Sequence, residues 1–252
     1  MTLGVIGVGH LAVSILKGLL RAGVASEKVL LSPRGYGTTL AERHGFSLAK
    51  DNAQVVAGSG VVLLAVRPAD ALSALDGLPW RQDHVLLSAC AGVPTARLAS
   101  AAGPASIVRI MPLTASEIGA SPTLVYPLRP EVEPFLSAIG SIIALETEDQ
   151  FEVGTVSAAI YGWAQALIRE SSDWSVANGL GEATARKLVA ETFVASGRMI
   201  AESNEPMDSI LESLCTPGGI TEAGLVNLQD KGAIVAWRQS CEVVLARLRK
   251  TT

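Results

Sequence analysis

The fold is decided by one stretch near the start of the chain, Gly7-Val8-Gly9-His10-Leu11-Ala12. An apolar run at 3–6 precedes it, and a helical period of apolar residues at 11–22 follows it. A buried strand, a turn with the spacing G-x-G-x-x-A and a helix together make the phosphate-binding unit of a Rossmann fold. We therefore predict that this stretch binds a dinucleotide; the alternative is a plain structural glycine turn.

Each position of the turn has a separate task in this prediction. Gly7 makes the tight turn, Gly9 lets the backbone approach the pyrophosphate, and Ala12 keeps the helix close to the strand. His10 and Leu11 complete the first turn of the helix, where free N–H groups point toward an anion. All five residues are candidate cofactor contacts.

The end of the next strand favours NADPH over NADH. An NAD enzyme places Asp or Glu there to accept hydrogen bonds from the ribose, whereas this chain reads Ser32-Pro33-Arg34-Gly35. Ser32 can hydrogen-bond a phosphate, and the planar guanidinium of Arg34 can pair with one. The alternative is that Arg34 is a solvated loop residue.

Strands and helices alternate in the first half, which predicts a doubly wound parallel sheet. The expected strands are 3–6, 28–32, 61–66, 85–88, 107–111, 123–125 and 142–146. The expected helices are 11–22, 38–44, 70–75, 95–102 and 131–139. Ligands of such sheets bind at the carboxyl ends of the strands. Candidate cofactor contacts at these ends are Val66, Arg67, Pro68, Ala89, Ala91 and Gly92, and Met111 is a candidate substrate contact.

The second half is expected to be entirely helical. Helical periods cover 151–172, 181–203, 207–214, 220–231 and 235–250. We place a Rossmann domain at 1–148 and an all-α dimerisation domain at 149–252. The apolar helices are too few to bury their own faces, which predicts a homodimer through them.

Composition excludes several classes. The chain has 252 residues and a formal net charge of -4, with no basic run that would predict binding to nucleic acid. Cys90, Cys215 and Cys241 have no metal-ligand spacing, and an odd number argues against a disulfide framework. We find neither a signal segment nor an apolar run long enough to span a membrane. The expectation is a cytoplasmic protein without a metal.

The whole pattern resembles the pyrroline-5-carboxylate reductase family. The resemblance rests on the opening glycine turn and on four further segments, Leu64-Ala65-Val66-Arg67-Pro68, Ser88-Ala89-Cys90-Ala91-Gly92-Val93, Val108-Arg109-Ile110-Met111-Pro112 and Thr216-Pro217-Gly218-Gly219-Ile220-Thr221-Glu222-Ala223-Gly224-Leu225. It implies NADPH-dependent reduction of a cyclic imine carboxylate to proline or a related product, in an interlocked dimer.

The resemblance also implies a substrate site. Thr221 matches the threonine that hydrogen-bonds the imine nitrogen, and it is the candidate catalytic residue. Backbone N–H groups at Gly218 and Gly219, at the start of a helix, can hold a carboxylate. Tyr161 is a further candidate donor to the substrate. The chain departs from the family pattern at Leu113 and within 157–163, which implies an altered substrate site.

Two other functions remain open at the level of sequence. One is a hydroxyacid dehydrogenase of the same two-domain plan, which needs a general acid such as Lys187. The other is a protein that binds NADPH without turnover.

Overall fold

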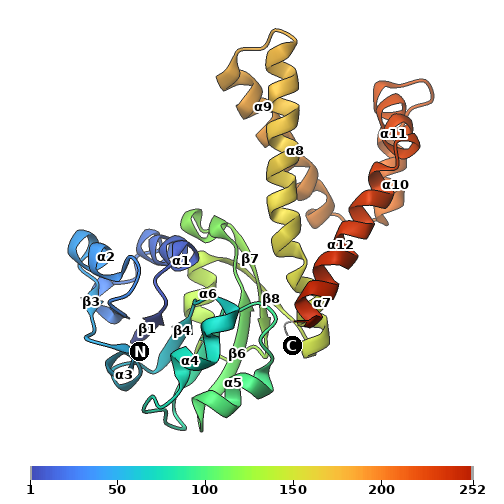
Figure 1. The fold of residues 1–252 in the computed structure, drawn as a ribbon. Helices are drawn as coiled ribbons and strands as arrows, with labels where there is room; N and C mark the ends of the chain where they lie inside the picture. Colours follow the sequence, from blue (N-terminus) through green and yellow to red (C-terminus); the bar gives the residue numbers. More distant parts are fainter. Residues whose placement is uncertain (1, 251–252) are drawn as a thin grey trace. The chain divides into compact units, whose positions relative to one another are not determined.

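The computed structural model describes residues 2–250 of the chain and divides them into two compact units. Within the described residues, the first unit runs to Ala158 and also includes 245–250; the second unit is Ala159–Val244. Figure 1 shows the sheet and its helices in the first unit and helices alone in the second.

The first unit is built on one eight-stranded sheet of order β3-β2-β1-β4-β5-β6-β7-β8. Its strands are β1 (Leu3–Ile6), β2 (Val29–Leu31), β3 (Ser47–Leu48), β4 (Val61–Leu64), β5 (Val85–Ser88), β6 (Ser106–Met111), β7 (Ser121–Tyr126) and β8 (Gly140–Ala144). The pairs from β3 to β6 are all parallel, in the order that defines a Rossmann fold. The predicted fold class is confirmed.

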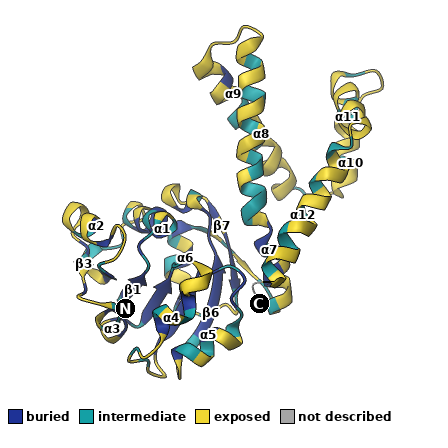
Figure 2. Ribbon diagram, viewed as in Figure 1, coloured by how far each residue is buried: buried dark blue, intermediate teal, exposed yellow. Residues whose placement is uncertain are grey.

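Helices cover both faces of this sheet, as double winding requires. The helical segments are α1 (His10–Arg21), η1 (Ser26–Lys28), α2 (Gly37–His44), α3 (Asn52–Ala57), η2 (Pro68–Asp70), α4 (Ala71–Leu75), α5 (Thr95–Ala102), η3 (Thr114–Ile118), α6 (Glu133–Ile139) and α7 (Glu148–Thr155). Along β1, Leu3 and Val5 join the core under α1 and α6, while Ile6 joins the core under α3, α4 and α5. Alternate residues of a strand point to opposite faces, so each buried strand stabilises both layers (Figure 2).

The first unit holds two elements that were not predicted from the sequence, and one strand of unexpected direction. No element was predicted for the segment that contains β3 and α3, because a two-residue strand and a six-residue helix show little periodicity. The last part of the sheet is not parallel throughout: β7 runs antiparallel to β6.

The packing of α7 explains where the first unit ends. Phe151 on α7 is 1% exposed and packs with Met111 and Leu124 of the sheet. This helix therefore belongs to the sheet unit, so the packing boundary falls after Ala158, beyond the expected boundary at 148.

The helices α8 (Ser157–Ala177), α9 (Glu182–Glu202), α10 (Met207–Leu214), α11 (Ile220–Asp230) and α12 (Ala233–Lys250) form the second half. The expectation that no strand occurs there is confirmed for the described residues. Between 159 and 244, Ala185 is the single buried residue. Trp174, Met199, Ile220 and Val243 are each at least two thirds exposed. These helices thus leave apolar side chains without a cover in one chain (Figure 2).

Candidate functional site

The two glycines of the opening turn are required for different reasons. Gly7 has φ +88°, and a Cβ there would lie 2.5 Å from Val66 Cγ1 and 2.8 Å from the backbone of Ala65. The chain's own packing therefore demands Gly7. Gly9 has an ordinary φ of -92°, and a Cβ there would meet no heavy atom within 4 Å. Its missing side chain leaves an open cradle on the surface of the turn, which fits the close approach of a ligand.

The start of α1 supplies free amides beside this cradle. The helix begins at His10, with Gly9 at the N-cap and no side-chain cap. The first hydrogen bond of the helix is donated by Val13 N–H to Gly9 O at 2.9 Å. The N–H groups of His10, Leu11 and Ala12 precede it and receive no partner from the helix itself. They make a site for an anion at the positive end of the helix.

Ser32 connects this turn to the end of β2. Gly7 N–H donates to Ser32 Oγ at 3.3 Å, and Ser32 is 1% exposed. Arg34 is exposed two residues later. A cavity of about 640 Å³ brings Gly7, Ser32, Arg34 and Val66 together. Four of the predicted cofactor residues therefore line one cavity at the carboxyl end of the sheet.

Most of the lining of this cavity was not predicted from the sequence. The unpredicted lining includes Lys50, Asp51, Asn52, Ala53, Asp70, Ser73, Ala74 and Leu78. Asp51 is the N-cap of α3, and its carboxylate accepts a hydrogen bond from Gln54 N–H at 2.8 Å. This Asp-x-x-Gln pattern before an apolar helix was the one available signal.

The remaining candidate cofactor residues sit on loops that follow β4 and β5. Arg67 and Pro68 are exposed at the start of η2. Gly92 has φ +68°, which only glycine adopts without strain, and Ala89 and Ala91 are small residues of the loop after β5.

Cys90, within the same loop, has a packing role. It is buried, and its Sγ donates to Val66 O at 3.5 Å. Burial raises the pKa of this thiol, so it stays protonated and unreactive.

Met111 packs inside the first unit. Its side chain is 7% exposed and lies against Leu124 and Phe151. Its predicted contact with a substrate remains a prediction, since the described packing is that of a core residue.

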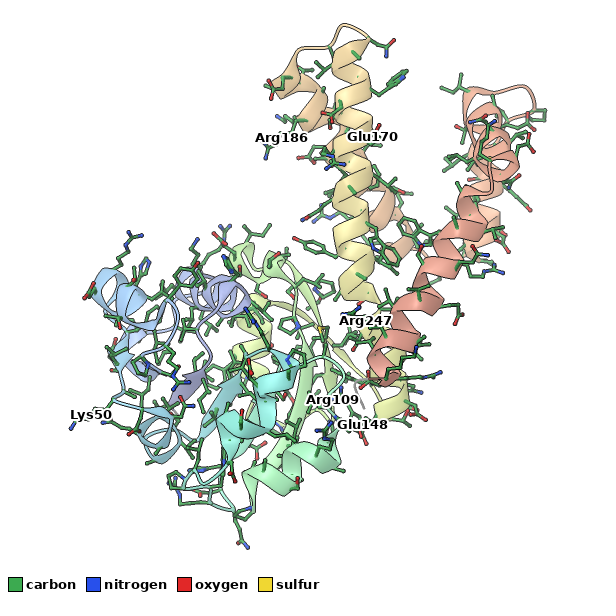
Figure 3. The ribbon with its side chains drawn as sticks, viewed as in Figure 1. Lys50, Arg109, Glu148, Glu170, Arg186 and Arg247 are labelled. Atoms are coloured by element: carbon green, nitrogen blue, oxygen red, sulfur yellow. The ribbon has the colours of Figure 1, made fainter. Side chains whose placement is uncertain are left out.

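Arg109, on the same strand, anchors α7 to the sheet. It is 1% exposed and donates to Glu148 at 2.8 Å and to Glu152 at 2.5 Å, with its guanidinium 4.6 Å from the centre of the Phe151 ring. Figure 3 shows Arg109 and Glu148 facing one another. Burial alone would raise the pKa of Glu148, but hydrogen bonds from Thr95 and Arg109 outweigh it and lower that pKa. Arg109 lies in one of the segments on which the family resemblance rests, Val108-Arg109-Ile110-Met111-Pro112, but the resemblance did not predict this structural role.

The turn before α11 satisfies its own amides. Gly218 N–H donates to Glu222 Oε2 at 2.7 Å, and Gly219 N–H donates to Thr216 O at 2.8 Å. These two N–H groups were expected to be open for a carboxylate, and both have partners in the chain. The expectation missed Glu222, whose side chain reaches back over the start of its own helix. A substrate carboxylate that binds Gly218 has to displace Glu222.

The other candidate substrate residues lie on helices of the second unit. Thr221 is exposed at the second position of α11, and Tyr161 is half-buried on α8. Lys187, on which a hydroxyacid dehydrogenase would depend, is exposed on α9. Among the described residues, no cluster of His, Cys, Asp and Glu is arranged to hold a metal, and no helix has the length and apolar character to cross a membrane.

Comparison with known proteins agrees with both units. Residues 2–92 match the family described as NADP oxidoreductase, coenzyme F420-dependent, and residues 148–251 match the pyrroline-5-carboxylate reductase dimerisation family. The chain is 28% identical to pyrroline-5-carboxylate reductase 1 of Bacillus spizizenii, over 97% of this chain and 87% of that protein. It is 29% identical to pyrroline-5-carboxylate reductase 3 of Xenopus laevis, over 98% and 94%.

A solved structure has the same fold. The NADP-bound pyrroline carboxylate reductase of Plasmodium falciparum aligns with a TM-score of 0.88 and 21% identity, covering 100% of this chain and 98% of that one. The glycine turn, the strand order and the helical second half define a two-domain oxidoreductase of the Rossmann class. Within that class, the chain is similar over nearly its whole length to pyrroline-5-carboxylate reductases, and its second half matches the dimerisation family of those enzymes.

Proposed function

We propose that the protein is an NADPH-dependent reductase of a C=N bond, and that its substrate is a cyclic imine carboxylate such as pyrroline-5-carboxylate. The observation that carries this proposal is the cavity that Gly7, Ser32 and Arg34 line together. Gly7 is followed in the chain by Gly9, the N-cap of α1, where a side chain would meet only open space. The curated relatives are named for the same reaction.

The first unit would hold the cofactor. The amides of His10, Leu11 and Ala12 bind the pyrophosphate, and Arg34 pairs with the 2′-phosphate through its guanidinium. Ser32 already accepts from Gly7, so it offers its hydroxyl proton to the same phosphate. When bound, NADPH supplies the hydride. The small residues Ala89, Ala91 and Gly92 leave room for a flat ring near the backbone.

The second unit would position the substrate. Thr221 is exposed and has a hydroxyl that can donate to, or accept from, the imine nitrogen. A protonated imine is already electrophilic, so orientation is the main contribution required of the protein. A substrate carboxylate at the turn before α11 replaces Glu222 as the acceptor from Gly218.

We also propose that the working form is a homodimer held by the helices of 159–244. The support is the exposure of Trp174, Met199 and Val243, together with the match to a dimerisation family. Apolar faces of this kind are buried when a second copy covers them.

The test follows NADPH oxidation with pyrroline-5-carboxylate, piperideine carboxylates, uncharged cyclic imines and 2-oxoacids. We expect turnover with cyclic imines and none with 2-oxoacids. Turnover of 2-oxoacids alone would instead support a hydroxyacid dehydrogenase, and tight NADPH binding without any turnover would support a non-catalytic role.

A matched variant tests the choice of cofactor. Arg34→Ala is expected to weaken NADPH binding about tenfold or more while leaving NADH binding unchanged, because a charge-assisted bond to the 2′-phosphate contributes about 1.5–3 kcal/mol. Arg97→Ala, on α5, is the control. An unchanged preference would mean that Arg34 is only a solvated loop residue.

A further inference from the structure

The loop at 33–37 is held tightly against the glycine turn. Gly35 has φ +71°, and a Cβ there would lie 2.3 Å from Val8 O. At Gly37 a Cβ would lie 2.0 Å from Ser32 O. Val8 and Gly35 also form a β-bridge outside the named strands. Gly35 lets the loop pack directly on the turn, and Gly37 lets the chain fold back on Ser32, with Tyr36 between the two glycines.

The backbone of Tyr36 is fixed by this packing, while its side chain reaches His10. Tyr36 N–H donates to Val8 O at 2.9 Å. Its hydroxyl lies 3.4 Å from His10 Nε2, and the two rings meet edge to face with centroids 5.4 Å apart. Tyr36 is 44% exposed, and His10 is also exposed. Two solvent-exposed side chains from separate segments therefore contact each other beside the glycine turn.

We propose that Tyr36 is a positioning residue that holds the imidazole of His10 against the pyrophosphate side of the bound dinucleotide. This inference rests on the proposed function, because it assigns a role within the same cofactor site. Tyr36 comes from the loop that carries Arg34, and His10 is the first residue of α1. The pair thus links the loop for the 2′-phosphate to the turn for the pyrophosphate.

The hydrogen bond between the two rings also sets the chemistry that His10 offers. When the Tyr36 hydroxyl donates to Nε2, the neutral imidazole carries its proton on Nδ1. Nδ1–H is then the donor available to a phosphate oxygen. Without Tyr36 the ring loses both its preferred tautomer and its fixed orientation, and ordering it on binding costs entropy.

The experiment measures dissociation constants for NADPH and NADH with the full-length protein and its variants. Tyr36→Phe keeps the ring edge and removes only the hydroxyl. We expect it to weaken NADPH and NADH binding equally, by about two- to twelvefold, the range for one neutral hydrogen bond. His10→Ala should weaken both nucleotides at least as much, and adding Tyr36→Phe to it should have no further effect. Tyr126→Phe, on β7, is the matched control and should change neither constant.

Several outcomes would overturn the assignment of Tyr36. Tyr36→Phe could leave both constants unchanged, or its effect could add fully to that of His10→Ala. A loss for NADPH alone would show that Tyr36 contacts the 2′-phosphate directly. If the wild-type protein binds neither nucleotide, the proposed function itself fails, and the role of Tyr36 fails with it.

Discussion

Replacing Gly9 by alanine separates the stability of the fold from binding at the turn. The substitution adds one methyl group where no heavy atom lies within 4 Å, at a φ of -92° that alanine adopts freely. Loss of a glycine stabilises the native state by about 0.4–1 kcal/mol through the unfolded chain. Alanine is a poorer N-cap than glycine by a similar amount, since the full range for lost caps is about 0.5–2 kcal/mol. The two effects oppose each other, so we expect a change in unfolding free energy within about 1 kcal/mol of zero.

The same methyl group occupies the cradle that the pyrophosphate is expected to enter. We expect NADPH binding to weaken at least tenfold, which corresponds to about 1.4 kcal/mol. Urea unfolding gives the first quantity, and titration of NADPH fluorescence gives the second. A stable Gly9→Ala variant with unchanged NADPH affinity would refute the assignment of this turn to the cofactor.

Gly7→Ala is the matched comparison, because it perturbs the fold instead. A left-handed φ costs a non-glycine residue about 1–2 kcal/mol. The new methyl group would also overlap Val66 and the backbone of Ala65, and overpacking adds about 1–3 kcal/mol. We expect the free energy of unfolding, measured with urea, to fall by about 2–5 kcal/mol. Gly7→Ala should therefore be the less stable of the two variants, whereas Gly9→Ala should bind NADPH more weakly per folded molecule.

Further predictions concern the ion cluster, the substrate turn and the dimer. Arg109→Met leaves the buried Glu152 and the half-buried Glu148 without their partner and should lower the unfolding free energy by about 3–5 kcal/mol in urea titrations. The pKa of Glu148 is lowered in the folded state, so its stabilisation is present above the unfolded value of about 4.5 and is lost as the pH falls below it. Glu148→Gln should therefore lose less stability than wild type over that acid interval, and an identical loss would argue against the assignment. Glu222→Gln removes the charge that competes at Gly218, so the KM for a carboxylate substrate should fall about two- to fivefold while that for its methyl ester stays constant. Val243→Glu should convert the dimer to a folded monomer, as read by analytical ultracentrifugation with circular dichroism.

The first half of the fold was predictable because its signals are local. The strand, turn and helix around Gly7 and Gly9 follow one another in sequence. The apolar runs at β4 and β5 are typical of buried parallel strands. The short strand β3 carries no such signal, since its two residues pair with β2 only when the sheet is assembled. The reversed direction of β7 was equally unreadable, because strand orientation depends on the path of the chain after β6.

The candidate site divides in the same way. Ser32 and Arg34 could be named from the sequence because the chain itself carries them to the end of β2. Asn52 and Leu78 line the same cavity from segments far along the chain, and the only signal there, the capping pattern of Asp51 and Gln54, indicates a helix start and not a cofactor site. At the turn that contains Gly218, the sequence motif could be recognised, but the hydrogen bond from Gly218 N–H to Glu222 could not be predicted from it.

The hydrogen bond between Gly218 N–H and Glu222 affects which substrates the turn would select. An open amide at Gly218 would favour any carboxylate, but an amide already bonded to Glu222 favours only a carboxylate that gains further contacts on arrival. Such contacts would have to come from the imine end of the molecule, through Thr221, because displacing one carboxylate by another gains nothing by itself. Binding at the turn and orientation of the C=N bond would then be coupled. A simple carboxylate such as acetate should compete poorly, whereas a cyclic imine that satisfies both ends should bind and be reduced.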